Sequence, residues 1–147
     1  MGRHLTSGPE VGHWVAGKLN SAFFEARSRA IGLVKDDCIV AGVIFENWNG
    51  RSLMAHMVVE DKLTRGFIHA IFDYAFTACN VLKVICPVSS ANLKSCRLVE
   101  NMGFNEEGRI KDAAPDGDVI LYTMTKPDCR FLGERYGQKQ PDAASNA

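Results

Sequence analysis

The polar residues that could act on a bound molecule lie within or at the ends of apolar segments. His56 lies inside the segment from Leu53 to Val59, and Glu60 follows that segment directly. An unperturbed imidazole exchanges its proton near neutral pH, so His56 is a candidate general base and Glu60 a second one. Asn92 stands before a short apolar helix pattern, with Ser95 three residues later, a spacing that suits ligand contact or a helix cap. The plainer alternatives are a strand histidine bonded to a neighbour, a surface charge and an ordinary cap.

Motifs typical of several enzyme classes are absent from the sequence. There is no G-x-x-x-x-G-K-[ST], G-x-G-x-x-G, G-x-S-x-G or H-E-x-x-H, so hydrolase, kinase and zinc-protease functions lose support. The five cysteines form no C-x-x-C pair, which favours reduced intracellular thiols over a disulfide frame or a zinc site. We therefore expect a cytoplasmic protein that uses no metal.

The charge balance limits the classes of partner. Lysine and arginine number 17, and so do aspartate and glutamate, for a formal net charge of +0. Nucleic acid and anionic membranes attract proteins with a basic excess, so we expect neither as a partner. No apolar run approaches the roughly 20 residues that cross a bilayer. These properties favour a small molecule or another protein as the binding partner.

The first half of the chain predicts a helix followed by an antiparallel meander. Apolar residues recur at helical spacing from Pro9 to Asn20, with proline near the start. Three segments rich in β-branched residues follow, and the "NWNG" between the second and third contains the Asn-Gly step that hairpin turns prefer. The three predicted strands are Ala30 to Val34, Cys38 to Phe45, and Leu53 to Val59.

The second half predicts a strand-helix-strand crossover and a hairpin. From Thr64 the apolar spacing changes to three and four residues, which indicates an amphipathic helix ending near Asn80. A continuous apolar strand from Val81 to Val88 and a helix from Asn92 to a glycine cap at Gly103 come next. The predicted hairpin strands are Arg109 to Ala113 and Val119 to Met124. We expect one mixed α/β domain over residues 1–136 and a disordered tail over 137–147.

The helix that begins at Asn92 carries the most specific pattern, N-x-x-S-x-x-L-x-x-x-x-G-F-x-x-E-G. Its matching residues are Asn92, Ser95, Leu98, Gly103, Phe104, Glu107 and Gly108. "DYAF" from Asp73 and "DVILYTM" from Asp118 stand before and after it. The whole resembles the GNAT superfamily of acetyl-CoA-dependent N-acetyltransferases, especially the branch that acetylates ribosomal-protein N-termini. The motifs extend from about Asp73 to Met124, and element order carries the resemblance elsewhere.

The resemblance implies a GNAT-like fold with acetyl-CoA as co-substrate. In this family the cofactor lies in a V-shaped gap between two central strands, here Leu53 to Val59 and Leu82 to Val88. Asn92 would then hydrogen-bond the pantetheine arm, and Ser95 would face the thioester sulfur. Members of the family often form homodimers through a surface on their C-terminal strands. In this chain the segment from Cys129 to Leu132 could extend that surface.

The expected diphosphate site is degenerate. Most members place R/Q-x-x-G-x-G/A before the first crossover helix, because bare amides at a helix N-terminus cradle the diphosphate. If Arg65 leads that motif, Ala70 fits its last position but Ile68 replaces the first glycine; if "DYAF" sets the alignment, both glycines fall on Lys62 and Thr64. The plain alternative is a helix start capped by Thr64. The candidate cofactor-binding residues here are Lys62, Thr64, Arg65, Gly66 and Phe67.

The mechanism implied by the resemblance is direct acetyl transfer to a primary amine. His56, or Glu60, would take the amine proton, and a backbone N–H near Val58 would stabilise the oxyanion. Many members carry a tyrosine acid seven residues after the asparagine, where this chain has Val99, so Ser95 or water must protonate the thiolate. The acceptor would be a protein N-terminus, a lysine or a small amine. The alternative function is a catalytically inactive GNAT-fold binding or regulatory module.

Overall fold

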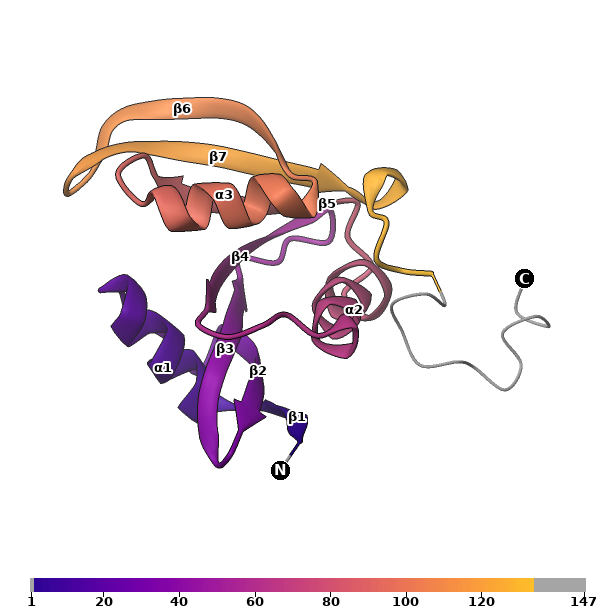
Figure 1. Ribbon diagram of the computed structural model, residues 1–147. Helices are drawn as coiled ribbons and strands as arrows, with labels where there is room; N and C mark the ends of the chain where they lie inside the picture. Colours follow the sequence, from indigo (N-terminus) through magenta and orange to yellow (C-terminus); the bar gives the residue numbers. More distant parts are fainter. Residues whose placement is uncertain (1, 134–147) are drawn as a thin grey trace.

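A computed structural model describes residues 2–133, in which three α-helices flank a seven-stranded mixed sheet (Figure 1). The strands are β1 (Arg3–Ser7), β2 (Arg29–Lys35), β3 (Cys38–Glu46), β4 (Ser52–Val59), β5 (Lys83–Ser89), β6 (Asn105–Ala114) and β7 (Gly117–Thr125). The helices are α1 (Pro9–Leu19), α2 (Arg65–Asp73) and α3 (Leu93–Met102), with a π-helical turn η1 (Tyr74–Ala78) and a 3-10 turn η2 (Lys126–Asp128). The predicted tail, 137–147, lies outside the described residues.

The sheet has the order β1-β2-β3-β4-β5-β7-β6, and its central pair determines its shape. β4 and β5 are parallel and joined by the α2 crossover, while every other neighbouring pair is antiparallel. Their pairing covers three positions only, from Ser52↔Lys83 to Met54↔Ile85. Beyond Met54 the two strands diverge. The predicted mixed sheet, with its meander, crossover and C-terminal hairpin, is confirmed.

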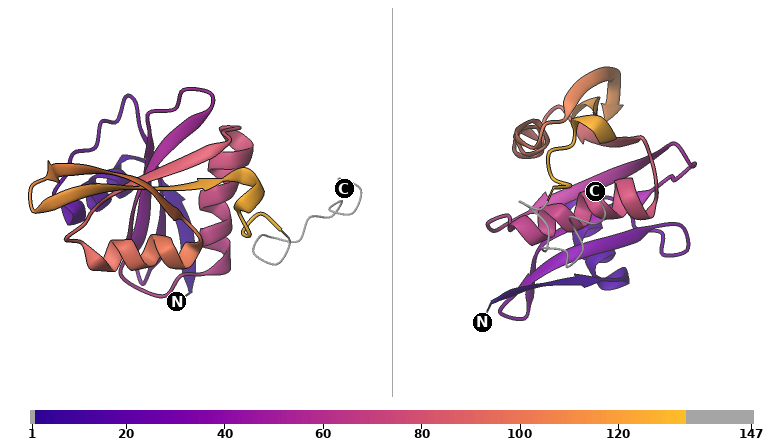
Figure 2. Two further views of the ribbon diagram at one scale, coloured as in Figure 1. Left: turned by 90° about the horizontal axis from the view of Figure 1, so that it is seen from above. Right: turned by 90° about the vertical axis from the view of Figure 1, so that its right-hand side faces the viewer.

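The two faces of the sheet are covered by different helices (Figure 2). Every second side chain of β4 faces the larger core cluster, where it packs with residues of α2 and α3, as expected for a strand with a period of two. These side chains are Leu53, Ala55 and Met57. Val58 points to the opposite face, where it packs with the smaller cluster formed by α1, β2 and β3. Because β4 is covered on both faces, its side chains are held in fixed positions beside the gap.

Close packing of α1 on the meander depends on glycine. A Cβ on Gly42 would lie 2.6 Å from Val15 Cγ2, and one on Gly32 would lie 2.8 Å from Val11 Cγ2. Real Cβ atoms do not approach so closely, so the two glycines let the helix lie directly on β2 and β3. This contact places the C-terminal end of α1 near the end of β4.

Some elements differ from the prediction. β1 was not predicted, because its residues are mostly exposed and give no apolar alternation. The helix expected to run to Asn80 is α-helical only to Asp73 and continues as the π-helical turn η1. Phe131, from the segment suggested for a dimer surface, is buried against Phe72 of the same chain, with ring centroids 5.2 Å apart. The homodimer stays a prediction.

Candidate functional site

A cavity of about 200 Å³ fills the angle between the diverging strands β4 and β5. The third side of this cavity is the first two turns of α3, and the end of α1 closes it. Its lining residues are Leu19, Ser21, Ala55, His56, Met57, Cys86, Pro87, Val88, Ser89, Asn92, Ser95, Leu98 and Val99. Within residues 2–133, the β5-facing backbone groups of β4 beyond Met54 have no strand partner, so they can bond a ligand in the gap.

The cavity continues outward as a groove of about 410 Å³ between the ends of β4 and α1 and the outer side of α3. The two spaces share the residues Leu19, Met57, Asn92, Ser95 and Leu98. Val58 and Glu60, both predicted site residues, line the groove. A long, narrow ligand could therefore place one end in the cavity and extend along the groove.

His56 lies on the cavity wall and is held by a neighbouring acid. Its Nε2 is 2.7 Å from Oε2 of Glu46, and both side chains are 24% exposed. Glu46 pairs with Met54 across the β3–β4 ladder, so His56 is its diagonal neighbour on the same face. Sequence reasoning missed Glu46; counting the hairpin register back from the Asn-Gly turn could have found it.

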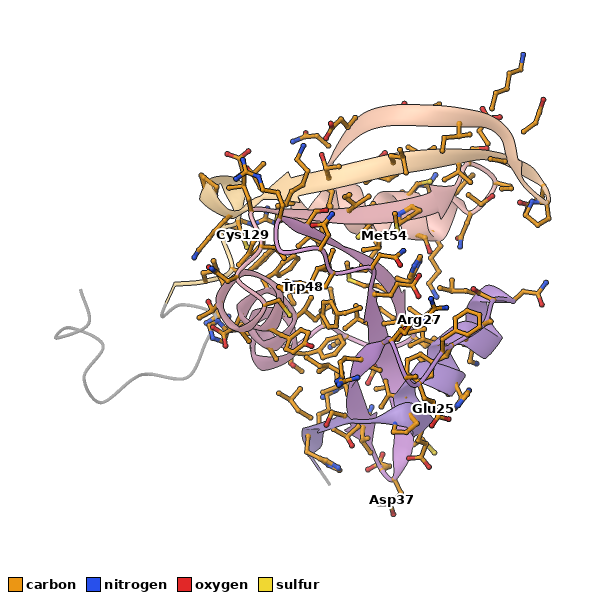
Figure 3. The ribbon with its side chains drawn as sticks, turned by 180° about the vertical axis from the view of Figure 1, so that it is seen from behind. Glu25, Arg27, Asp37, Trp48, Met54 and Cys129 are labelled. Carbon is orange, nitrogen blue, oxygen red and sulfur yellow. The ribbon has the colours of Figure 1, made fainter. Side chains whose placement is uncertain are left out.

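Glu46 also borders a second cavity, of about 390 Å³, on the side of the molecule shown in Figure 3. Arg27 and Trp48, both labelled there, line it, and the Trp48 indole N–H donates to the Cys79 carbonyl at 2.9 Å. Burial raises the pKa of Tyr74, another lining residue, to about 12, so its hydroxyl is neutral at physiological pH. The Glu46 side chain therefore stands between this cavity and His56.

Asn92 and Ser95 lie together at the start of α3. The Asn92 side-chain oxygen accepts the Ser95 N–H at 3.2 Å, so Asn92 is the N-cap, and Gly103 ends the helix in the left-handed region with φ 106°. Both Asn92 and Ser95 also line the cavity and the groove. The two interpretations of Asn92, cap and ligand contact, are therefore compatible in one geometry.

The loop before α2 begins at the groove, because Glu60 lines the groove and is followed directly by Asp61. Neither the cavity nor the groove is lined by Lys62, Thr64, Arg65, Gly66 or Phe67. Thr64 caps α2 by accepting the Phe67 N–H at 3.1 Å. A hydrogen bond from the Lys62 backbone N–H, together with Arg3, holds the pKa of Asp61 below its usual range. The structure thus brings His56, Val58, Glu60, Asn92 and Ser95 to the two spaces, whereas the five loop residues are not among the lining residues of either.

Other chemically active side chains near the gap are held in structural contacts. The Tyr122 hydroxyl donates to Glu100 at 2.6 Å, and burial raises the pKa of that phenol. Burial also raises the pKa of the Cys86 thiol, which keeps it protonated and weakly nucleophilic. Cys96 is buried and its thiol lies 3.6 Å from the Ser89 carbonyl oxygen. None of these three supplies a free acid or nucleophile to the cavity.

Comparison with known proteins gives matches at the level of structure. No family model matches the chain, and no curated protein matches it by sequence. A mutant of the spermidine N-acetyltransferase SpeG from Vibrio cholerae superposes with a TM-score of 0.69 at 20% identity, over 90% of this chain and 99% of that one. Mutant forms of the spermidine/spermine N-acetyltransferase SpeG from the same organism superpose with a TM-score of 0.68 at 18% identity. That match covers 86% of this chain and 96% of the SpeG chain. The fold is that of the GNAT acetyltransferases.

A third structure, described as a probable acetyltransferase, covers 69% of this chain and 62% of its own, with a TM-score of 0.57 at 22% identity. The GNAT fold inferred from the Asn92 to Gly108 motif is thus confirmed by structures of N-acetyltransferases. The closer resemblance to the ribosomal-protein branch stays a prediction. Among the helices of residues 2–133, none is long and apolar enough to cross a membrane.

Proposed function

We propose that this chain is an acetyl-CoA-dependent N-acetyltransferase that acetylates a primary amine by direct attack on the thioester. The observation that carries the proposal is the cavity between the diverging β4 and β5, with His56 on its wall, Glu46 bonded to that histidine from outside the cavity, and Asn92 and Ser95 at its mouth. A thioester in this gap would meet unpaired backbone groups of β4 and the His56 imidazole. The GNAT fold supports the same activity.

The His56–Glu46 pair suits general-base catalysis. When Nε2 donates its hydrogen to Glu46, Nδ1 holds the lone pair that can accept a proton, and the carboxylate stabilises the imidazolium that forms. The amine nitrogen then bonds to the thioester carbonyl carbon, its proton passes to His56, and the carbon–sulfur bond breaks. Ser95 or a water molecule supplies the proton that the departing thiolate takes up.

The oxyanion of the tetrahedral intermediate needs a donor in the gap. The backbone of β4 around Val58, beyond the last β4–β5 pair, is the nearest regular source of such N–H groups. Their positions are fixed by the β3 ladder on the other side of β4, where Gly42 pairs with Val58. Fixed donors cost no reorganisation during the reaction, which is the main advantage of an oxyanion hole.

Two observations, the sequence resemblance and the superposed structures, bear on the class of acceptor. The resemblance of the Asn92 helix favours a protein N-terminus or a lysine, whereas the superposed structures are those of spermidine acetyltransferases. All three are primary amines that the same chemistry acetylates, so we propose a primary-amine acceptor and test these classes side by side. The five free cysteines agree with the cytoplasmic location that we also propose.

A thermal melt with and without acetyl-CoA tests the co-substrate first, with ATP as a control. At about 100 times its Kd, acetyl-CoA adds roughly 2.7 kcal/mol of stability, which shifts Tm by several degrees. Release of free CoA thiol is then measured with spermidine, a peptide with a free N-terminus and a lysine peptide. We expect His56→Gln to lower kcat about 100-fold or more while the acetyl-CoA shift persists.

The second candidate function is a GNAT-fold module without catalysis. Val99 at the position of the usual tyrosine acid, and the absence of the family's glycines from the expected diphosphate loop, favour it. A Tm that does not change when acetyl-CoA is added at millimolar concentration refutes the acetyltransferase proposal. A clear shift without thiol release from any amine supports a binding module.

A further inference from the structure

The second cavity, which Glu46 borders, presents two arginines that have no acidic partner. Arg27 and Arg29 both line it, and both residues are exposed. The guanidinium carbon of Arg27 lies 5.6 Å from the centroid of the Phe24 ring, and Nη1 of Arg29 donates to the Ser28 carbonyl at 3.0 Å. Within residues 2–133 neither arginine pairs with a carboxylate. The folded chain thus leaves both positive charges without a counterion.

The carboxylates near these arginines are already bonded to histidines. Oε2 of Glu25, which comes from the same segment, is 2.8 Å from Nε2 of His13, and Oε2 of Glu46 is 2.7 Å from Nε2 of His56. Glu46 is the only acidic residue among the described residues that line the second cavity. The two arginines therefore give this cavity a net positive charge, which favours a ligand that carries an anionic group.

A buried hydroxyl between the two arginines also lacks a partner. Ser28 is 4% exposed, and its Oγ makes no hydrogen bond in the part of the chain that the structure describes. Ser28 lines a pocket of about 190 Å³ that shares Arg27 and Glu46 with the second cavity. Buried polar groups are normally hydrogen-bonded, so this hydroxyl is available to a ligand that enters the pocket.

The wall of the second cavity is aromatic. Phe45 and Tyr74 pack with their ring centroids 4.8 Å apart, and Trp48 is 62% exposed while its indole N–H is held by the Cys79 carbonyl. A concave site with apolar walls and a few fixed polar groups is typical of small-molecule binding, and a volume of about 390 Å³ lies within the usual range. The cavity therefore suits a small organic molecule with an anionic group.

We propose that the second cavity binds the amine acceptor and selects a small amine that carries a carboxylate. This inference rests on the proposed function, because it names the acceptor class of the same reaction. The carboxylate meets Arg27 and Arg29, and the carbon skeleton lies along Trp48. The amine end is drawn to Glu46, whose carboxylate bonds His56 on the wall of the thioester cavity. Arginine binds carboxylates through charge-assisted hydrogen bonds, which are stronger than neutral ones.

A polyamine fits this arrangement poorly. Spermidine, the substrate named for the superposed structures, has no anionic group, and its ammonium groups would approach the two arginines. The single carboxylate of the cavity, that of Glu46, is already bonded to His56. We therefore expect the acceptor to differ from spermidine although the fold is shared.

The first test compares acceptors that differ only in charge. Release of CoA thiol is measured with glycine, β-alanine, γ-aminobutyrate and δ-aminovalerate, each beside its own neutral amide, and with spermidine. A peptide can also supply the carboxylate, so an amidated peptide that begins with alanine and aspartate is compared with its asparagine counterpart. We expect the best acid to exceed its amide about tenfold or more in kcat/KM, mainly through KM, and to exceed spermidine.

The second test assigns the preference to the two arginines. Arg27→Gln with Arg29→Gln should bring the ratio of acid to amide close to one, whereas Arg27→Lys with Arg29→Lys should keep a preference for the acid. Arg51→Gln with Lys111→Gln is the matched control, because it removes two exposed cations that do not line the second cavity. The Tm shift with acetyl-CoA shows that each variant is folded and binds the co-substrate. Raising salt from about 50 mM to about 500 mM should increase KM for the acid and leave KM for the amide unchanged.

The outcomes separate the two proposals. Equal rates with every acid and its amide, or spermidine as the best acceptor, overturn the acceptor class and leave the acetyltransferase proposal standing. A glutamine double variant that keeps the parental preference overturns the role of the arginines. A preference limited to the aspartate peptide supports the same carboxylate contact and assigns it to a peptide. A parent protein that releases no thiol with any amine and shows no Tm shift with acetyl-CoA overturns the proposed function itself.

Discussion

Replacing Asn92 separates the stability of α3 from the binding of acetyl-CoA. Asn92→Ala removes the oxygen that accepts the Ser95 N–H, and loss of an N-cap costs about 1 kcal/mol, or roughly 4 °C of Tm in a domain of this size. It also removes the side-chain amide hydrogens that no described residue binds and that we place against the pantetheine arm. One neutral hydrogen bond is worth about 1 kcal/mol, which is roughly fivefold in Kd.

Asn92→Ser is the matched control, because serine caps a helix about as well as asparagine but has no amide. Tm is measured by calorimetry without ligand, and Kd for acetyl-CoA by titration. We expect the alanine variant to lose both stability and affinity, and the serine variant to melt with the parent while binding about fivefold more weakly. A serine variant with parental affinity would show that Asn92 is a cap and has no contact with the cofactor.

Two further predictions concern stability. Gly42→Ala should lower the free energy of unfolding by about 1–3 kcal/mol, because its Cβ would meet Val15, whereas Gly17→Ala, with no atom within 4 Å, should not destabilise in the same urea titration. Folding lowers the pKa of three carboxyl groups, those of Asp61, Glu106 and Glu107. Their ionised forms therefore stabilise the folded state fully at a pH above the pKa values of the unfolded chain, and this stabilisation is lost as the pH falls below about 4. Asp61→Asn should therefore reduce the difference in unfolding free energy between pH 7 and pH 3; an unchanged difference contradicts this reasoning.

The long periodic elements of the fold could be predicted from the sequence because their signals are local. The Asn92 cap and the Gly103 end delimit α3 at the predicted residues, and the Asn-Gly turn fixes the β3–β4 hairpin. β1 carries no such signal, because it is an exposed edge strand defined by its pairing with β2 and by the Arg3–Asp61 contact 58 residues away. The spacing of hydrophobic residues within one segment cannot indicate a contact between residues so far apart in the sequence.

The candidate site was predictable in part for the same reason. His56, Val58, Glu60, Asn92 and Ser95 lie on or beside regular elements, so a fold resemblance brings them to the gap. Glu46 depends on the register of the β3–β4 hairpin, which a count back from the Asn-Gly turn could have given, but no local pattern marks it as a site residue.

The short contact between β4 and β5 also bears on cooperativity. β1 to β4 form one part of the sheet and β5 to β7 the other, and only three residue pairs join them across the ladder, with the shared core supplying the rest. A molecule held between the strands touches both parts and opposes their separation. Its binding should slow amide hydrogen exchange in strands of both parts, including those that never contact it, so that the ligand makes one cooperative unit of two.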